Sequence, residues 1–182
     1  MKTYTIIGGV NGAGKSSLSG VLKRRLDDLG VIVDVDKLTA NLGKGAIEGG
    51  KAAVSLIDDC LARGISFAQE TTLSGHRTEK TAQAARDRGY SVRLFYVGLA
   101  TLEESLKRIK NRVERGGHDI PCEDVARRFN ERFDALRRVL PYCDSAELYD
   151  NDNGFTLVAE YRNGELIALT DKRPAWLIEL LG

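Results

Sequence analysis

The chain alternates between short runs of apolar residues and longer segments in which apolar residues recur every three or four positions. The first pattern predicts buried strands, and the second predicts helices with one apolar face. The expected strands cover residues 4–7, 31–35, 65–69, 91–97 and 147–149. The expected helices run from about residue 15 to a cap at Gly30, over 54–61, over 77–88, onward from Thr101, and over 123–139. Strands that alternate with helices predict an α/β fold with a parallel sheet covered on both faces.

The end of the chain follows a different pattern. Two strand-like runs, 155–161 and 165–169, flank Asn163-Gly164, which favours a type I′ turn between antiparallel strands. A short helix containing Trp176, Leu177, Leu180 and Leu181 is expected to begin at Pro174. We expect this hairpin and helix to cover the sheet edge or a neighbouring subunit, with Trp176 exposed.

A glycine-rich loop follows the first expected strand. The sequence Gly9-Val10-Asn11-Gly12-Ala13-Gly14-Lys15-Ser16 fits G-x-x-x-x-G-K-[ST] and precedes an amphipathic helix. Such a loop wraps phosphate groups with backbone amides at a helix N-terminus. Lys15 would reach the β- and γ-phosphates, and Ser16 would bind Mg²⁺. We expect nucleotide contacts from Gly9, Asn11, Gly12, Ala13, Gly14, Lys15, Ser16 and Ser17. The motif predicts a P-loop fold that binds ATP, with GTP as an alternative.

Carboxylates follow the second and third expected strands. Ligands of open parallel sheets bind at the carboxyl ends of the strands, so Asp36 is our candidate for the base that accepts a proton from an attacking hydroxyl. The structural alternative is that Asp36 caps a helix starting at Lys37, and Asp34 is a candidate supporting group. Glu70 is a candidate Mg²⁺ ligand together with Ser16, or a group that binds substrate. Thr71 and Thr72 are further candidates for substrate contact, or the polar end of a strand.

Arginines are concentrated in residues 101–138. Arg108, Arg112 and Arg115 share one helix face, and Arg127, Arg128 and Arg132 follow a break at Gly116-Gly117-His118. Two such helices are typical of a mobile lid that brings guanidinium groups onto a transferring phosphoryl group. The alternative is a solvated charged face. We expect Arg115 and Arg128 to contact phosphate, and Arg112 and His118 to lie on the substrate side.

Bulk properties exclude several classes of protein. The net charge of +1 and the lack of a basic groove interleaved with aromatics argue against a nucleic-acid partner. No apolar run approaches the roughly 20 residues that span a bilayer, so we expect no membrane contact and a cytoplasmic protein. The three cysteines show no C-x-x-C spacing and are interpreted as reduced.

Five stretches together resemble the zeta toxin family of P-loop kinases, in its short bacterial form. They are the phosphate loop, Asp36, Glu70-Thr71-Thr72-Leu73-Ser74-Gly75, Arg112-Val113-Glu114-Arg115-Gly116-Gly117-His118, and Tyr149-Asp150-Asn151. The resemblance covers about residues 1–151, with two differences. The chain is shorter than the toxins in question, and Val10 stands where they usually have proline.

The resemblance implies a nucleotide-kinase-like fold that uses ATP and Mg²⁺. Better-known members phosphorylate a hydroxyl of the sugar in UDP-N-acetylglucosamine. By position, Lys15 would bind phosphate, Asp36 would be the catalytic base, Glu70 would lie on the substrate side, and Arg115 and Arg128 would steady the phosphates. We therefore divide the chain into a kinase-like domain, residues 1–151, with its lid at about 101–138, and a hairpin–helix appendage of the same domain, residues 152–182.

Two functions remain in contention from the sequence. The leading hypothesis is a kinase that transfers phosphate from ATP to a hydroxyl of a small molecule, with a UDP-activated amino sugar as the candidate acceptor. The second is a nucleotide-dependent switch that acts through a protein partner such as an antitoxin, suggested by the C-terminal helix and Trp176. A nucleic-acid kinase is less favoured because of the near-neutral charge.

Overall fold

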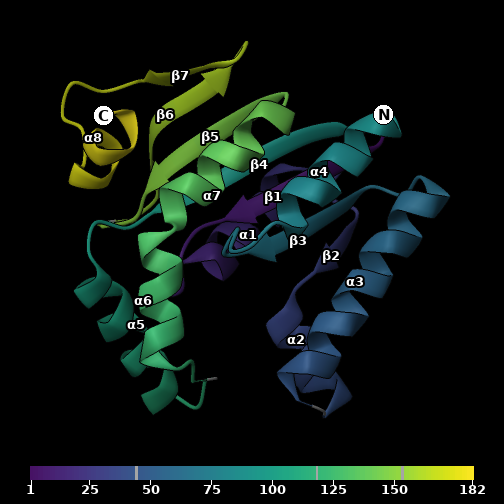
Figure 1. The fold of residues 1–182 in the computed structure, drawn as a ribbon, viewed down its shortest axis with the longest axis horizontal. Coiled ribbons are helices and arrows are strands. Elements are labelled where there is room, and N and C mark those ends of the chain that lie inside the picture. Colours follow the sequence, from purple (N-terminus) through teal and green to yellow (C-terminus); the bar gives the residue numbers. More distant parts are fainter. Residues whose placement is uncertain (44, 118, 153) are drawn as a thin grey trace.

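A single seven-stranded sheet forms the centre of the computed structural model, which describes residues 1–43, 45–117, 119–152 and 154–182 (Figure 1). The strand order is β2-β3-β1-β4-β5-β6-β7; the first five are parallel and the last two antiparallel. The strands are β1 (Thr3–Gly8), β2 (Val31–Val33), β3 (Phe67–Thr71), β4 (Ser91–Gly98), β5 (Ser145–Asp150), β6 (Thr156–Arg162) and β7 (Glu165–Ala168). The expected parallel α/β fold is confirmed.

Helices connect the parallel strands and cover both faces of the sheet. They are α1 (Lys15–Arg25), α2 (Val35–Leu42), α3 (Ala46–Arg63), α4 (Arg77–Asp87), α5 (Leu102–Glu114), α6 (Cys122–Asn130), α7 (Arg132–Val139) and α8 (Ala175–Leu181), with a 3-10 turn at Leu140–Tyr142. Within the described residues, none of these helices combines the length and the apolar character needed to pass through a membrane.

The two faces of β1 belong to two separate apolar cores. Tyr4 and Ile6 pack with residues of α3, α4, α7 and α8, whereas Ile7 packs with Leu18 and Leu22 of α1. This alternation follows from the two-residue period of a strand. Because β1 is central and fully buried, the loop at its carboxyl end starts from a fixed position.

Several expected boundaries differ from the structure. β2 ends at Val33 rather than at residue 35, because Asp34 caps α2 by accepting hydrogen bonds from the amides of Asp36 and Lys37. α1 ends at Arg25, so Gly30 belongs to the following turn and does not cap it. The single helix expected over 123–139 is two helices, separated at Glu131.

The lid region and the α2–α3 pair project past the same end of the sheet (Figure 1). This is the end at which β1, β2 and β3 finish, so α5 and α6 lie on one side of the phosphate loop and α2 on the other. The open-sheet rule predicts a ligand site at this end.

The C-terminal residues add two strands to the sheet and then form a helix that packs against it. β6 pairs with β5, and the hairpin turn has positive φ at both Asn163 and Gly164, as the type I′ prediction requires. α8 then buries Trp176, Leu177 and Leu180 in the larger core. The expectation of an exposed Trp176 is wrong: the residue is 0% exposed, because its ring lies against β4.

The contact between Trp176 and Gly98 generates a stability prediction. A Cβ atom on Gly98 would lie 2.2 Å from Cε2 of Trp176, so Gly98→Ala must displace the indole. We expect it to lower the free energy of unfolding by about 1–3 kcal/mol, the usual effect of overpacking a core. Gly20→Ala is the control, because nothing lies within 4 Å of its Cβ position in α1, and it should raise stability slightly. Urea denaturation measures both, and equal effects of the two substitutions would contradict the prediction.

Candidate active site

A cleft of about 640 Å³ lies at the carboxyl end of the parallel strands. The phosphate loop, the lid, the start of α2 and the end of β3 all contribute to its lining. Its lining is formed by Asn11, Gly12, Gly14, Lys15, Ser16, Ser17, Asp34, Val35, Asp36, Gln69, Glu70, Thr71, Thr72, Arg108, Arg112, Asp119, Ile120, Pro121, Asp124 and Arg128. Most residues that the sequence singled out therefore meet in one cleft.

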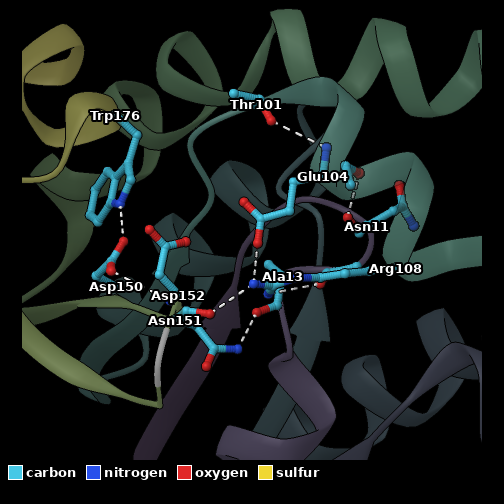
Figure 2. A network of polar contacts seen from close by, with 11 residues as sticks. Asn11, Ala13, Thr101, Glu104, Arg108, Asp150, Asn151, Asp152 and Trp176 are labelled. Carbon is cyan, nitrogen blue, oxygen red and sulfur yellow. Dashed lines mark hydrogen bonds and ion pairs between the residues drawn. The ribbon is translucent and has the colours of Figure 1, made fainter. Parts of the chain in front are cut away.

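Side chains bind every backbone carbonyl of the phosphate loop from residue 9 to residue 13. The Lys15 ammonium donates to the carbonyls of Gly9 and Val10, at 2.8 and 3.0 Å. The Ser105 hydroxyl donates to that of Asn11 at 2.7 Å. Arg108 donates to Gly12 at 3.5 Å, and the Asn151 amide donates to Ala13 at 2.8 Å (Figure 2). With its carbonyls held in this way, the loop can present amides to an anion.

Gly14 is required by the closeness of this packing. Its φ is 106°, which side chains rarely adopt, and a Cβ atom would lie 2.5 Å from Nδ2 of Asn151. The glycine of the motif therefore allows the loop to touch the end of β5 as well as to bend.

Lys15 lines the cleft and its side chain is half-buried. The pKa of its ammonium group is lowered to about 8, chiefly because the group is desolvated and in smaller part by the positive charges of Arg112 and Arg128. The carboxylates of Glu70 and Asp36 oppose this shift by raising the pKa. Lys15 therefore lies within the electrostatic reach of these carboxylates and arginines, and an anion in the cleft would favour its charged form.

Glu70 and Ser16 form the candidate metal site. The Ser16 hydroxyl donates to Oε2 of Glu70 at 2.8 Å, while Oε1 is buried without a hydrogen-bond partner in the described part of the chain. A serine oxygen beside a carboxylate with spare acceptor capacity fits Mg²⁺, which takes few protein ligands and completes its shell with phosphate and water.

Asp34 and Asp36 have different surroundings. Asp34 is buried, caps α2 and forms an ion pair with Lys37 at 2.9 Å. Because Asp34 performs the capping, the alternative that Asp36 is the helix cap is wrong. The carboxylate of Asp36 lies on the cleft wall, in the first turn of α2.

The two threonines after Glu70 also line the cleft, but Thr71 has a structural engagement. Its hydroxyl accepts from the Leu73 amide at 3.0 Å and lies 3.3 Å from the Thr78 hydroxyl. These contacts shape the turn in which Leu73 adopts a positive φ of 62°. Thr72 is therefore better placed than Thr71 to contact a substrate through its side chain.

Five arginines of the lid occupy three different environments. Arg108, Arg112 and Arg128 line the cleft, and Arg128 donates to Oδ1 of Asn11 at 3.2 Å. Arg115 does not line it: it borders a neighbouring depression of about 540 Å³ beside Gly116 and Gly117. Arg132 is buried between the rings of Phe129 and Phe133 and bonds to Glu179 of α8. His118 lies outside the described residues.

Sequence reasoning gave too little weight to Arg108 and Asn151. Arg108 stands one helical turn before Arg112, on the same face, which was the available signal. Asn151 carried no signal beyond its place in the Tyr149-Asp150-Asn151 stretch, because its partner Ala13 is 138 positions away in the chain.

Comparison with known proteins identifies relatives of this chain. A family model described as "Zeta toxin" matches residues 46–158, more than half of the chain. An uncharacterised protein of Haemophilus influenzae is 32% identical over 124 residues, covering 65% of this chain and 86% of that protein. The family match begins after the phosphate loop and Asp36, so the site assignments at those positions rest on geometry and motif.

Solved structures share the fold. The AvrRxo1-ORF1:AvrRxo1-ORF2 complex with sulphate ions matches with a TM-score of 0.73 and 20% identity, covering 98% of this chain. This chain spans 63% of the matched AvrRxo1 chain, and the same complex has been solved with ATP. A structure of the PezAT toxin–antitoxin system of Streptococcus pneumoniae matches with a TM-score of 0.62 and 23% identity, over 85% of this chain and 69% of the other.

The resemblance noted from the sequence is thereby confirmed, and with it the P-loop kinase fold. Because the family model covers more than half of the chain, and the phosphate loop, facing carboxylates and arginine lid share one cleft, the protein belongs to the zeta toxin family of P-loop kinases.

Proposed function

We propose that this protein transfers the γ-phosphoryl group of ATP to a hydroxyl of a small molecule, in the cytoplasm. The observation that carries the proposal is the composition of the cleft, in which the phosphate loop, Asp36 and Glu70 line a single space. A nucleotide switch would need the loop, but it would have no need of a carboxylate base opposite the phosphates.

The donor side binds and orients the triphosphate. The loop amides and Lys15 would hold the β- and γ-phosphates, and Arg108, Arg112 and Arg128 would stabilise charge on the transferring group. GTP would fit the same phosphate contacts. Ser16 and Glu70 would hold Mg²⁺, which neutralises charge on the β- and γ-phosphate oxygens when bound.

The acceptor side prepares the hydroxyl. Asp36 would accept its proton as the oxygen attacks the γ-phosphorus, while the bond from that phosphorus to the bridging oxygen breaks and ADP leaves. Thr72 and Glu70 line the cleft and would contact the acceptor. We propose a UDP-activated amino sugar such as UDP-N-acetylglucosamine as the first acceptor to examine, on the basis of family membership.

A companion protein is proposed on the same basis. The PezAT structure is of a toxin–antitoxin system, and the AvrRxo1 structure is of an ORF1:ORF2 complex. By analogy, an antitoxin-like partner would bind this chain and restrain its activity.

Replacing the base tests the transfer mechanism. Asp36→Asn keeps the shape of the side chain but cannot accept the proton, so kcat should fall by about 10²- to 10⁴-fold while the Kd for Mg-ATP changes little. A coupled ADP assay with UDP-N-acetylglucosamine, other nucleotide sugars and free amino sugars, followed by ³¹P NMR of the product, measures this. Asp58→Asn, on the exposed side of α3, is the matched control. An unchanged kcat in Asp36→Asn would show that Asp36 is not the base.

The lowered pKa of Lys15 predicts proton uptake on nucleotide binding. The free protein loses the Lys15 proton as pH rises through about 8, whereas bound phosphate raises this pKa. ATP affinity should therefore be greatest below pH 8 and weaken above it. Near pH 9, the protein should take up ~1 proton for each ATP bound. Calorimetry at pH 7 and 9, in buffers of different ionisation enthalpy, measures the uptake. Lys15→Met should abolish it, and the same uptake in that variant would assign it to another group.

Toxicity tests the companion proposal. Inducible expression of the chain alone should slow the growth of a bacterial host, because an unrestrained kinase would consume its acceptor. Asp36→Asn at equal protein levels should restore growth. If the wild-type protein and Asp36→Asn affect growth equally, kinase activity does not cause the growth defect. An antitoxin that restrains kinase activity would then have no function.

A further inference from the structure

The last helix is linked to the phosphate loop by two hydrogen bonds to consecutive residues at the end of β5. Trp176 of α8 donates from Nε1 to Oδ1 of Asp150 at 2.7 Å, and the next residue, Asn151, donates to the carbonyl of Ala13 at 2.8 Å (Figure 2). Figure 2 shows the indole N–H directed at the Asp150 carboxylate, with Asn151 between that carboxylate and Ala13. The tail therefore contacts the loop through the end of β5.

Each of these hydrogen bonds is held in place by packing. The Trp176 ring is fully buried, lies against Gly98 and has its centroid 6.2 Å from that of Tyr96. Asp150 is the last residue of β5 and pairs with Gly98 in the sheet. A buried indole N–H needs an acceptor. The Asp150 carboxylate provides that acceptor, and the hydrogen bond fixes the orientation of the carboxylate.

Asn151 is held from a second side. Its backbone carbonyl accepts from Arg108 at 2.8 Å, and Arg108 also pairs with Glu104 and reaches the Gly12 carbonyl. The loop after β5 therefore connects the tail, the lid helix α5 and the phosphate loop.

The tie to Ala13 fixes the direction of an amide. The peptide between Ala13 and Gly14 is planar, so holding its carbonyl on one side points its N–H to the other. Gly14 has no Cβ atom and therefore restricts its own backbone little, so the hydrogen bond from Asn151 matters for the orientation of this peptide. Gly14 lines the cleft, so this peptide is part of the surface that would meet a phosphate.

We propose that Trp176 is a positioning residue for nucleotide binding, which acts through Asp150 and Asn151 to fix the Ala13–Gly14 peptide. The proposal rests on the nucleotide binding proposed above for the loop. It assigns the tail, residues 152–182, a part in ATP affinity.

The test measures the Kd of Mg-ATP by calorimetry for variants on both sides of the Trp176–Asp150 hydrogen bond. Trp176→Phe keeps an aromatic ring and removes the donor, and we expect about five- to tenfold weaker binding, the range for loss of one positioning hydrogen bond. Asp150→Ala removes the acceptor and should weaken binding equally. Asp150→Asn keeps an acceptor oxygen and should retain near wild-type affinity.

Leu180→Ala is the matched control in the same helix. Leu180 is buried in the core but its side chain takes no part in the hydrogen-bonded chain, so this variant should lower the thermal unfolding temperature without changing the Kd. Wild-type affinity in Trp176→Phe, or equal weakening by Leu180→Ala, would overturn the proposal. Equal Kd values for Asp150→Ala and Asp150→Asn would also overturn it, even if Trp176→Phe failed to fold. Failure of the wild-type protein to bind any nucleotide would instead refute the proposed function.

Discussion

The satisfaction of the loop carbonyls is the constraint on which the rest of the site depends. A loop that offers its N–H groups to an anion must place its carbonyl groups elsewhere, and buried carbonyls need donors. Here five successive carbonyls, from residue 9 to residue 13, are bound by side chains of Lys15, Ser105, Arg108 and Asn151. These donors come from α1, α5 and the end of β5. The phosphate loop is therefore assembled by the whole fold and is not an independent local motif.

The same arrangement brings both signs of charge into the cleft. Lys15 and the lid arginines line it together with the carboxylates of Asp36 and Glu70. Desolvation disfavours the charged form of Lys15 and is the main reason that its pKa is lowered to about 8. A triphosphate bound beside Lys15 would favour the charged form of its ammonium group, and the lid arginines would stabilise charge on the phosphates.

The C-terminal hairpin and helix illustrate how sequence patterns inform and mislead. The turn at Asn163-Gly164 could be predicted from the sequence because type I′ geometry demands positive φ at both positions. The burial of Trp176 could not be predicted from the sequence, since an apolar residue in a short terminal helix can face either solvent or core. Only the close approach of α8 to Gly98 shows that its ring is buried and its N–H is bound to Asp150.

The sequence by itself determined the parallel α/β architecture, the phosphate loop and the presence of acidic residues at strand ends, because these depend on periodicity and on contiguous motifs. It did not determine which aspartate caps α2, nor that Arg108 rather than Arg115 lines the cleft. Those outcomes depend on the residue at which α2 begins and on how α5 is rotated about its axis, and a difference of one residue changes either. It also could not pair Asn151 with Ala13, since contacts between residues far apart in the chain are set only when the strands and helices pack together.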